Sequence, residues 1–349
     1  MRRLAVLFVI CGALWPSAIM AAEPGPAPPP LPVYDHIVIV VEENKDFDQI
    51  LGDQSAAPYL RQLASEGAVF NQMFAEEHFS QGNYFWLFSG SNHNVGFFDE
   101  VPSKANHADY PFTASNLGEQ LIKKGLTFKG YSESLPEIGY AGVIGPENCA
   151  KVDCVYARKH VPWISFANVP NGSTVETSSN LRFADFPTDF DKLPTVAFVI
   201  PNLLNDMHNG APAQSIPTGD NWLKQHLDAY YQWAKSHNSL LIVTFDENDD
   251  TFGYAGLTTP FANPGTTYPP ASRLGQLLLD LQNRVVTIFA GAHIRPGIYQ
   301  EGRGITHVNI LRTIEAIYGL PKSGAQQPNA AGLGIDGEKI ITDVFETTR

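Results

Sequence analysis

The segment Ser239–Asp250 constrains the fold of this chain more than any other part of the sequence. It reads SLLIVTFDENDD, so an apolar run ends abruptly in acidic residues and an amide. A short apolar run rich in branched residues is typical of a strand buried on both faces, as in a parallel sheet covered by helices. Carboxylates gathered at the end of such a strand repel one another unless a cation lies between them. The alternative for this segment taken alone is a solvated acidic turn.

The same pattern of an apolar strand followed by polar side chains recurs along the chain. His36–Val41 precedes a Glu-Glu-Asn sequence, and Thr195–Ile200 leads into a segment with an aspartate and a histidine. Ligands of open α/β sheets bind outside the carboxyl ends of the strands. The recurrence therefore predicts an α/β fold with a mostly parallel sheet and a cation site at one edge. The side chains expected there are Glu43, Asn44, Asp206, His208, Asp246 and Glu247.

A serine precedes the next informative run. In HFSQGNYFWLFSG the residues Tyr84–Phe88 predict a buried helix, and Ser80 lies at its start. Backbone N–H groups and the dipole at a helix N-terminus favour an anion and lower the pKa of a nearby hydroxyl. Ser80 is therefore either a nucleophile or simply the N-cap of the helix. His307 occupies a similar position, at the start of the helix predicted for His307–Tyr318.

Two further groups of residues are candidates for substrate contact. The basic cluster Arg158, Lys159 and His160 is a candidate anion contact in so acidic a chain, although basic clusters are usually solvated surface. Four aromatic residues could line an apolar approach for a lipid head group, or could instead belong to the core. They are Trp86, Phe88, Tyr254 and Phe261.

The residue types at the predicted sheet edge indicate a chemistry. Oxygen-rich shells suit Mg²⁺, Mn²⁺ or Ca²⁺, whereas imidazole favours Zn²⁺ or iron. A serine beside a divalent cation can lose its proton near neutral pH and attack an electrophile. Phosphorus fits best, because the cation stabilises charge on the attacking and non-bridging oxygens. The sequence therefore predicts a divalent cation (Mg, Mn, Ca or Zn) beside Ser80.

Charge and length limit the partners. The chain has 349 residues and a formal net charge of -13. Such a charge argues against nucleic acid or an anionic membrane as a major partner, but not against a phosphorylated small molecule or lipid head group, which a bound cation can hold. The length allows a large buried core.

The N-terminal residues predict export. Residues 1–22 resemble a signal peptide, with Arg2 and Arg3 before a short apolar run and a cleavage site near Ala21/Ala22. The run is too short to span a bilayer, so no stable membrane insertion is expected. Residues 23–33 form a proline-rich linker, and residues 34–349 a single domain. Secretion or periplasmic localisation would allow Cys149 and Cys154 to form a disulfide.

Five segments in order resemble the bacterial phosphoesterase family of secreted acid phosphatases and phospholipases C. The resemblance runs from about Tyr34 to Pro321 and is closest to short secreted acid phosphatases, including phosphoinositide phosphatases. It implies an alkaline-phosphatase-like α/β/α sandwich with a mostly parallel central sheet. The segments are HIVIVVEENKDFDQILG, HFSQGNYFWLFSG, AFVIPNLLNDMHNG, GDNWLKQHLDAYYQWAKSHNSLLIVTFDEND and HVNILRTIEAIYGLP.

The resemblance also implies roles for individual residues. Ser80 matches a nucleophile that becomes phosphorylated and contacts the metal, and Asn83 matches a residue that holds the phosphoryl group. Phe79 and Gly82 stand where close relatives often carry prolines, which could loosen the loop before Ser80. The implied metal ligands are Glu43, Asn44, Asp246 and Glu247. A second metal subsite, or phosphate contacts and leaving-group protonation, is implied for Asp206, His208 and His307.

These observations predict a secreted acid phosphatase that hydrolyses phosphomonoesters through a phosphoserine. One alternative is a phospholipase C acting on phosphodiesters, although family phospholipases of that type are generally longer. A sulfatase is disfavoured because the chain has no Cys-x-Pro-x-Arg sequence. A non-catalytic periplasmic protein that binds an anion through its metal is a further alternative, and Ser80 beside a complete ligand set argues against it.

Overall fold

The structure is a computed structural model, and it describes residues 31–95, 99–146, 148–149, 154–249, 283–300, 304–325 and 335–346. The predicted signal peptide and most of the proline-rich linker lie outside the described residues. Tyr254 and Phe261, two of the aromatic residues considered for an apolar approach, also lie outside them.

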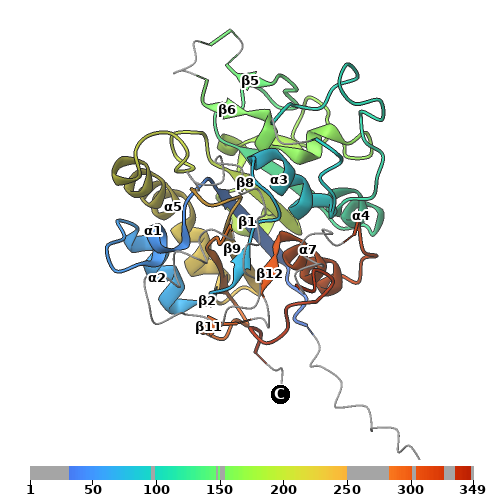
Figure 1. The fold of residues 1–349 in the computed structure, drawn as a ribbon. Helices are drawn as coiled ribbons and strands as arrows, with labels where there is room; N and C mark the ends of the chain where they lie inside the picture. Colours follow the sequence, from blue (N-terminus) through green and yellow to red (C-terminus); the bar gives the residue numbers. More distant parts are fainter. Residues whose placement is uncertain are drawn as a thin grey trace, which may run out of the picture.

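The described residues form a central sheet of eight strands in the order β11-β2-β10-β9-β1-β8-β4-β7 (Figure 1). Short runs of branched and aromatic residues form these strands, and most of their side chains are buried, which suits a sheet covered on both faces. The strands are β1 (His36–Glu42), β2 (Ala68–Phe70), β4 (Phe128–Ser132), β7 (Asn180–Arg182), β8 (Val196–Ile200), β9 (Ser239–Phe245), β10 (Thr287–Gly291) and β11 (Gly297–Tyr299).

Most neighbouring strands are parallel. β1 pairs in parallel with β8 and β9, and β4 pairs in parallel with β8 and β7. The exception is β10, which runs antiparallel to β9 and β2. The prediction of a mostly parallel sheet is confirmed. The direction of β10 depends on the connection before it, which a strand's own sequence does not encode.

The register between β1 and β9 sets the position of the site. His36 pairs with Ser239 and Glu42 pairs with Phe245, so the two strands end side by side. The backbone N–H of Asp246 then donates to the carbonyl oxygen of Glu42 at 3.0 Å. The polar residues that follow both strands consequently leave the sheet at one edge.

Helices cover both faces of this sheet. Figure 1 shows α2 and α5 on one side and α3, α4 and α7 on the other, which gives an α/β/α sandwich. The helices are α1 (Phe47–Leu51), α2 (Pro58–Glu66), α3 (Ser80–Ser89), α4 (Leu117–Lys123), α5 (Pro212–Ala234) and α7 (His307–Ile317). Among the described residues, no helix combines the length and apolar character that crossing a bilayer requires.

The long helix α5 begins earlier than the sequence indicates. The sequence predicts a helix over 218–235, but α5 starts at Pro212 and contains Pro217. Proline is tolerated at the first position of a helix because the N–H group there has no intrahelical partner, which accounts for Pro212. Pro217 lies beyond the first turn and lacks the N–H that would bond to the Ala213 carbonyl. The buried face of α5 includes Trp222 and Leu227, which pack into one cluster of apolar side chains that runs from Tyr34 to Phe345.

Short elements complete the described chain. Between β5 and β6 the predicted disulfide Cys149–Cys154 is present, with sulfurs 2.00 Å apart. The remaining strands are β3 (Met73–Phe74), β5 (Ile144–Gly145), β6 (Tyr156–Ala157) and β12 (Ile305–Thr306). The 3₁₀ helices are η1 (Arg158–His160), η2 (Pro162–Ser165), η3 (Phe183–Asp185) and η4 (Phe190–Lys192).

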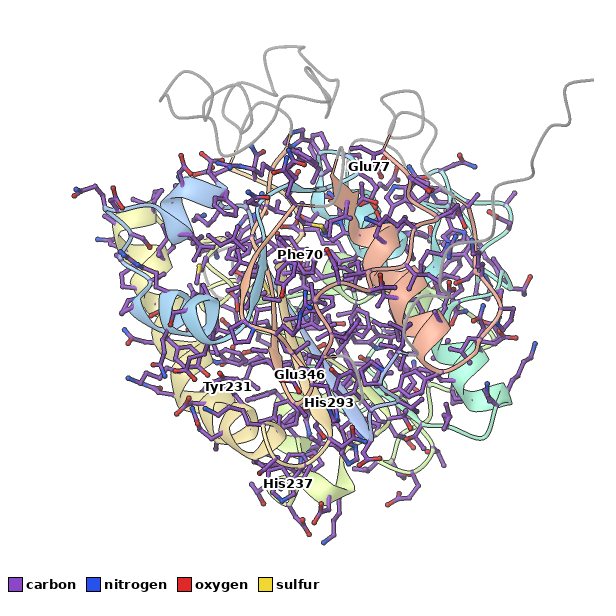
Figure 2. The ribbon with its side chains drawn as sticks, turned by 90° about the horizontal axis from the view of Figure 1, so that it is seen from below. Phe70, Glu77, Tyr231, His237, His293 and Glu346 are labelled. Carbon is purple, nitrogen blue, oxygen red and sulfur yellow. A yellow bond between two sulfur atoms is a disulfide. The ribbon has the colours of Figure 1, made fainter. Side chains whose placement is uncertain are left out.

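The two ends of the sheet differ in chemistry. Figure 2 shows Glu77, from the loop before α3, and His237, from the turn before β9, at opposite ends of the molecule. Glu77 lies at the end where β1 and β9 finish, and buried acidic side chains gather at this end. The candidate site therefore lies outside the carboxyl ends of the central strands, as expected for an open α/β sheet.

Candidate active site

Ser80 is the first residue of α3, and it is not the N-cap. The N-cap is Phe79, which has a φ of 75° and makes no side-chain cap. The interpretation of Ser80 as a simple N-cap is therefore wrong. The backbone N–H of Phe79 donates to Glu247 Oε2 at 2.8 Å, which holds the turn before the helix against the end of β9. The Ser80 hydroxyl remains available for other contacts.

The hydroxyl of Ser80 contacts the predicted metal-ligand set directly. Its Oγ donates to Glu43 Oε2 at 3.0 Å, and Lys159 Nζ lies 3.5 Å from the same Oγ. Tyr84, one turn further along α3, donates its O–H to Glu43 Oε1 at 2.5 Å. Ser80, Glu43 and Tyr84 are all at most 1% exposed. The end of β1 and the start of α3, distant in sequence, thus meet at one buried point.

Asn44 links the ends of β1 and β9. Its backbone N–H donates to Asp246 Oδ1 at 3.1 Å, and its side-chain Nδ2 donates to Glu247 Oε1 at 3.1 Å. Asn44 has a φ of 43°, in the left-handed region that asparagine tolerates better than most residues. The second carboxylate oxygen of Glu247 lies 2.9 Å from His78 Nδ1. The structure therefore brings together Glu43, Asn44, Asp246 and Glu247.

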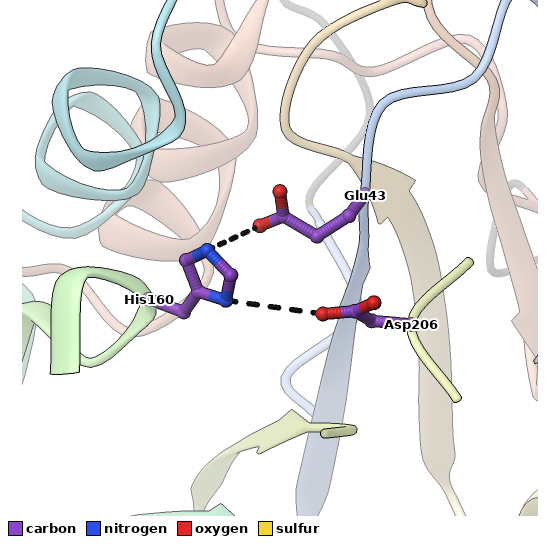
Figure 3. Close-up of side chains that lie close together, drawn as sticks. All are labelled: Glu43, His160 and Asp206. Carbon is purple, nitrogen blue, oxygen red and sulfur yellow. Dashed lines mark ion pairs between the residues drawn. The ribbon is translucent and has the colours of Figure 1, made fainter. Parts of the chain in front are cut away.

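His160 joins this group from the opposite side. Figure 3 shows its imidazole between the carboxylates of Glu43 and Asp206. His160 Nε2 lies 3.1 Å from Glu43 Oε1, and Nδ1 lies 3.9 Å from Asp206 Oδ2. The ring stacks on Tyr84, with centroids 5.0 Å apart and an interplanar angle of 10°. His160 was predicted as a substrate contact, but the structure buries it among candidate metal ligands.

Burial dominates the electrostatics of the site. It raises the pKa of Glu43 to about 8, with the charge of Asp206 acting in the same direction and Lys159 opposing both. Burial likewise raises the pKa of Asp206, and it raises that of Asp246 together with the charges of Glu43 and Glu247. The pKa of His160 lies well below its usual range, first because of burial and then because of Lys159. A neutral imidazole among crowded carboxyl groups is the form that binds metal.

Buried polar atoms of the site that have no hydrogen-bond partner indicate whether the site could bind a cation. Buried oxygens and nitrogens normally have hydrogen-bond partners. Several here have none among the described residues, and a divalent cation would satisfy them. Glu43, His160 and Asp206 each offer an atom within 4.8 Å of the others. The unpartnered atoms are Asn44 Oδ1, Asp246 Oδ2, Asp206 Oδ2 and His160 Nε2. The residues therefore fit a metal.

His307 makes two contacts that occupy its ring. Nδ1 lies 2.7 Å from Glu76 Oε2, and Nε2 lies 2.8 Å from the carbonyl oxygen of Phe245. Both partners are acceptors, so both nitrogens donate and the ring is cationic. Burial is the largest single influence and lowers the pKa of His307, but Glu76 and the Phe245 carbonyl together raise the pKa above its ordinary value. As placed here, neither nitrogen is available to a metal or to a leaving group.

Asn83 and Arg158 form hydrogen bonds with other parts of the chain in this structure. Asn83 Oδ1 accepts from the N–H groups of Glu76 and Glu77, both at 3.1 Å, and its Nδ2 donates to the Glu77 carbonyl at 2.6 Å. Arg158 donates to the Ala141 carbonyl and to the Tyr110 hydroxyl. Contact of either side chain with a phosphoryl group stays a prediction.

Lys159 is the member of the basic cluster that faces Ser80. Its Nζ donates to Asp99 Oδ2 at 2.6 Å, while Asp99 Oδ1 accepts from the backbone N–H of Gln81 at 3.0 Å. His208 lies near the same region and is half-buried, and its backbone N–H donates to Asp206 Oδ1 at 2.8 Å. Its Nδ1 lies 2.9 Å from Asn209 Oδ1.

Two glycines allow close packing beneath the site. A Cβ on Gly82 would lie 1.7 Å from Glu77 Oε1, so glycine at this position makes room for that carboxyl group. A Cβ on Gly130 of β4 would lie 2.1 Å from the indole of Trp163. Trp163 also donates its indole N–H to Asn180 Oδ1 at 3.1 Å, which anchors η2 and the segment just before it, including His160.

Sequence reasoning missed several contributors. Tyr84 was assigned only to a buried helix, Glu76 carried no signal beyond its charge, and His160 stood in an irregular basic segment. The spacing of Ser80 and Tyr84, four residues apart, could have shown that both face the same side of a helix. Of the aromatic residues considered for an apolar approach, Phe88 packs instead against Phe128 and Trp163.

The fold resembles that of the alkaline-phosphatase superfamily. One solved structure of that superfamily, from Vibrio parahaemolyticus, superimposes with a TM-score of 0.52 at 14% identity, and covers 84% of this chain and 69% of its own. Similarity at this identity concerns the fold alone. The central sheet with helices on both faces agrees with the predicted sandwich.

The chain belongs to the phosphoesterase family, whose model matches residues 53–321, and it is a phosphoesterase enzyme. A phosphatidylinositol-3-phosphatase of Mycobacterium tuberculosis is 40% identical over 326 residues, which are 93% of this chain and 90% of that protein. A probable acid phosphatase of Kluyveromyces lactis is 27% identical over 86% of this chain. The match spans 62% of that yeast protein, which is longer.

Proposed function

We propose that this protein is a secreted acid phosphatase that hydrolyses phosphomonoesters with Ser80 as its nucleophile. The contact of Ser80 Oγ with Glu43 Oε2 at 3.0 Å is the observation that carries this proposal. It places a hydroxyl at a helix N-terminus, beside a carboxylate that can accept its proton and beside a lysine. The names of the relatives from Mycobacterium tuberculosis and Kluyveromyces lactis support the same reaction.

Each residue of the site has a separate role in the proposed reaction. Glu43, Asn44, Asp246 and Glu247 would hold a divalent cation, with Ser80 completing the shell. When bound, the cation would favour the Ser80 alkoxide and neutralise charge on the phosphoryl oxygens. Lys159 lies 3.5 Å from Ser80 Oγ, where its ammonium group can contact a phosphoryl oxygen.

The chain's own groups move the protons. The Ser80 proton leaves along its hydrogen bond to Glu43 as Oγ attacks phosphorus, and the alcohol oxygen departs in line. Because both nitrogens of His307 are engaged, His208 is the histidine that protonates the departing oxygen. Water then attacks the phosphoserine, which releases inorganic phosphate and regenerates the Ser80 hydroxyl.

Replacing the nucleophile tests this proposal. Ser80→Ala should reduce phosphate release from p-nitrophenyl phosphate by more than about 10³-fold, as expected when a nucleophile is removed. The matched control is Ser89→Ala at the other end of α3, whose hydroxyl contacts the Phe85 and Ser91 carbonyls and His93 Nε2 but no residue of the site. Acid quenching during turnover should trap a phosphoryl group on Ser80. Near-normal activity of Ser80→Ala would refute the assignment.

The substrate class has its own test. A monoesterase should release p-nitrophenol from p-nitrophenyl phosphate much faster than from its phosphorylcholine diester, whereas a phospholipase C should show the reverse preference. The relative from Mycobacterium tuberculosis makes phosphatidylinositol 3-phosphate the first lipid substrate to assay. Export of the chain after cleavage near Ala21/Ala22 accords with the Cys149–Cys154 disulfide, and N-terminal sequencing of the exported protein would test it.

A further inference from the structure

Lys159 is held beside the nucleophile by a residue that lies outside the metal-ligand set. Its Nζ donates to Asp99 Oδ2 at 2.6 Å and lies 3.5 Å from Ser80 Oγ. The side chains of Lys159 and Asp99 are only 21% and 20% exposed, so solvent screens this ion pair less than it screens a surface pair. Because the contact with Asp99 is much the shorter of the two, Asp99 fixes the position of the ammonium group.

The same carboxylate also binds the start of α3. Asp99 Oδ1 accepts from the backbone N–H of Gln81 at 3.0 Å, and Gln81 is the second residue of the helix that Ser80 begins. The Gln81 side chain donates in turn to the Glu100 carbonyl at 2.9 Å. One carboxylate therefore connects Lys159 with the helix turn that carries the nucleophile.

The backbone of Asp99 adopts a conformation that most residues avoid. Its φ is 51°, in the left-handed region that aspartate and asparagine tolerate better than most other residues. Such a conformation costs free energy and persists where the surrounding contacts maintain it. At Asp99 those contacts are the hydrogen bonds of both carboxylate oxygens, to Gln81 and to Lys159.

A competing carboxylate acts on the same ammonium group. Burial lowers the pKa of Lys159, but the charges of Glu43 and then Asp99 raise it above its ordinary value. Glu43 accepts from the hydroxyls of Ser80 and Tyr84 and is an implied metal ligand. Without Asp99 we expect Lys159 to turn toward Glu43, where its charge would repel a bound cation and would no longer be directed at a phosphate.

We propose that Asp99 is a positioning residue, which holds the Lys159 ammonium group beside Ser80 and away from Glu43. An ammonium group has three N–H donors, so Lys159 can bind Asp99 and a phosphoryl oxygen together. This inference rests on the proposed function, in which Lys159 contacts the phosphoryl group, and adds a residue that touches neither substrate nor metal. Since Asp99 is an anion near the site, its charge alone would disfavour phosphate. Positioning and charge therefore predict opposite effects of its removal.

Binding of inorganic phosphate separates the two effects without reference to turnover. The purified full chain, loaded with Mn²⁺, is titrated with inorganic phosphate in a calorimeter. Asp99→Asn preserves the shape of the side chain and suits the same φ, but it removes the carboxylate that holds Lys159. Phosphate binding should weaken by about 10-fold or more, as expected when a hydrogen bond from a charged group is lost. Unchanged or tighter binding by folded Asp99→Asn would overturn the proposal.

A double-mutant cycle tests whether Asp99 acts through Lys159. Lys159→Met alone should weaken phosphate binding at least as much as Asp99→Asn does. In the double variant, Asp99→Asn should add less than about 2-fold, because a residue that acts through another has no effect once the other is removed. Additive losses in the folded variants would show that Asp99 acts independently of Lys159 and would overturn the proposal.

Glu100→Gln is the matched control. It removes the same charge from the next residue, which is exposed, and leaves in place the carbonyl that Gln81 contacts. Phosphate binding should change by less than about 2-fold, as expected for an exposed charge. A loss as large as that in Asp99→Asn would assign the effect to charge and overturn the proposal. Thermal unfolding checks that each variant folds, and Asp99→Gly, which tolerates the same φ, replaces Asp99→Asn if that variant does not.

Turnover distinguishes failure of this inference from failure of the proposed function. With p-nitrophenyl phosphate, Asp99→Asn should raise KM by about 10-fold and change kcat by less than about 3-fold, since Lys159 binds phosphoryl oxygens in both the ground and transition states. Phosphate binding that depends on Asp99 in a protein that hydrolyses no phosphomonoester would support the positioning role and contradict the proposed function. Phosphatase activity whose KM, like phosphate binding, is unchanged in Asp99→Asn would support the proposed function and overturn the positioning role.

Discussion

Two groups of buried charged residues in this protein are compensated in different ways. Around Arg312 every charge has a partner: Arg312 Nη1 donates to Glu315 Oε2 at 2.8 Å, and its Nε and Nη2 donate to the two carboxylate oxygens of Glu338. Glu315 Oε1 accepts from the backbone and the hydroxyl of Ser323. Around Ser80 carboxylates outnumber cations, and oxygens of Asp206 and Asp246 have no hydrogen-bond partner in the described chain.

The difference separates a structural cluster from a functional one. A buried ion network that is satisfied from within the chain fixes how a helix packs, here the end of α7 against the residues that follow it. A buried group of like charges with unpartnered oxygens destabilises the fold unless something from outside enters. The first cluster is satisfied within the chain, whereas the second has unpartnered oxygens that we expect a ligand to satisfy.

Removing one charge from the complete cluster should have the largest effect. Arg312→Met leaves Glu315 buried without its cation, so the free energy of unfolding should fall by about 3–5 kcal/mol. Urea denaturation followed by circular dichroism measures it. The control Arg182→Met removes an exposed partner of Asp185 and should change stability by less than about 1 kcal/mol. A similarly small change in Arg312→Met would mean that the two clusters do not differ as described.

Metal removal should affect the incomplete cluster next most strongly. At a free Mn²⁺ concentration of 100 times Kd, binding adds about 2.7 kcal/mol to the free energy of unfolding, and a chelator removes that increment. Thermal unfolding with and without chelator measures the shift in Tm. Wild type and Arg312→Met should show the same metal increment, since the Arg312 cluster binds no ion. A Tm that does not respond to metal would contradict the interpretation of the site.

Glu77 offers a pH test of a half-buried carboxyl group that has an amide partner. Burial raises its pKa to about 7, against hydrogen bonds from Asn92 that lower it. The folded state therefore holds a proton that the unfolded state releases near pH 4.5, so stability should fall as pH rises from about 4.5 to 7. Glu77→Gln should flatten this part of the Tm profile. An unchanged profile would exclude Glu77 as its source.

The smallest effect should appear when a site carboxylate is neutralised without metal. In chelated protein, Asp246→Asn removes one of the crowded charges and should raise the free energy of unfolding by about 1 kcal/mol. The same variant should lose the stabilisation by Mn²⁺, because a carboxylate ligand is missing. Chemical denaturation of both proteins in chelator and in Mn²⁺ measures both effects. Destabilisation of the chelated variant would indicate that Asp246 is compensated within the chain.

The sequence predicted the incomplete cluster better than the complete one. Two apolar strand segments are followed by Glu43 and Asp246. Because the carboxyl ends of parallel strands meet at one edge of a sheet, the sequence predicts that these two carboxylates lie close together. The contact of Ser80 with Glu43 did not follow from this argument, because Ser80 begins a helix, and its place beside the ligands came from the family resemblance. Arg312 and Glu338 are far apart in sequence and lie in no recognisable pattern, so their pairing depends on how the chain beyond α7 folds back.

His160 and His307 show where prediction from the sequence fails. His160 belongs to a basic, irregular segment, and only tertiary packing turns its ring toward Glu43 and away from solvent. His307 was correctly expected at the start of a helix, but its partner Glu76 is set by contacts between α7 and the loop before α3. Spacing in the sequence therefore does not reveal which histidine nitrogens already form hydrogen bonds within the chain.

The slot in β4 that receives Trp163 makes the chemistry sensitive to a residue of the sheet interior. Any side chain at Gly130 would displace the indole, and the displacement would pass along η2 to Lys159 and His160. A mutational scan scored only by activity would then rank Gly130 with the catalytic residues, although it touches none of the reacting groups. A parallel scan of protein abundance would distinguish variants that fail to fold from folded variants in which only the His160 ring has moved.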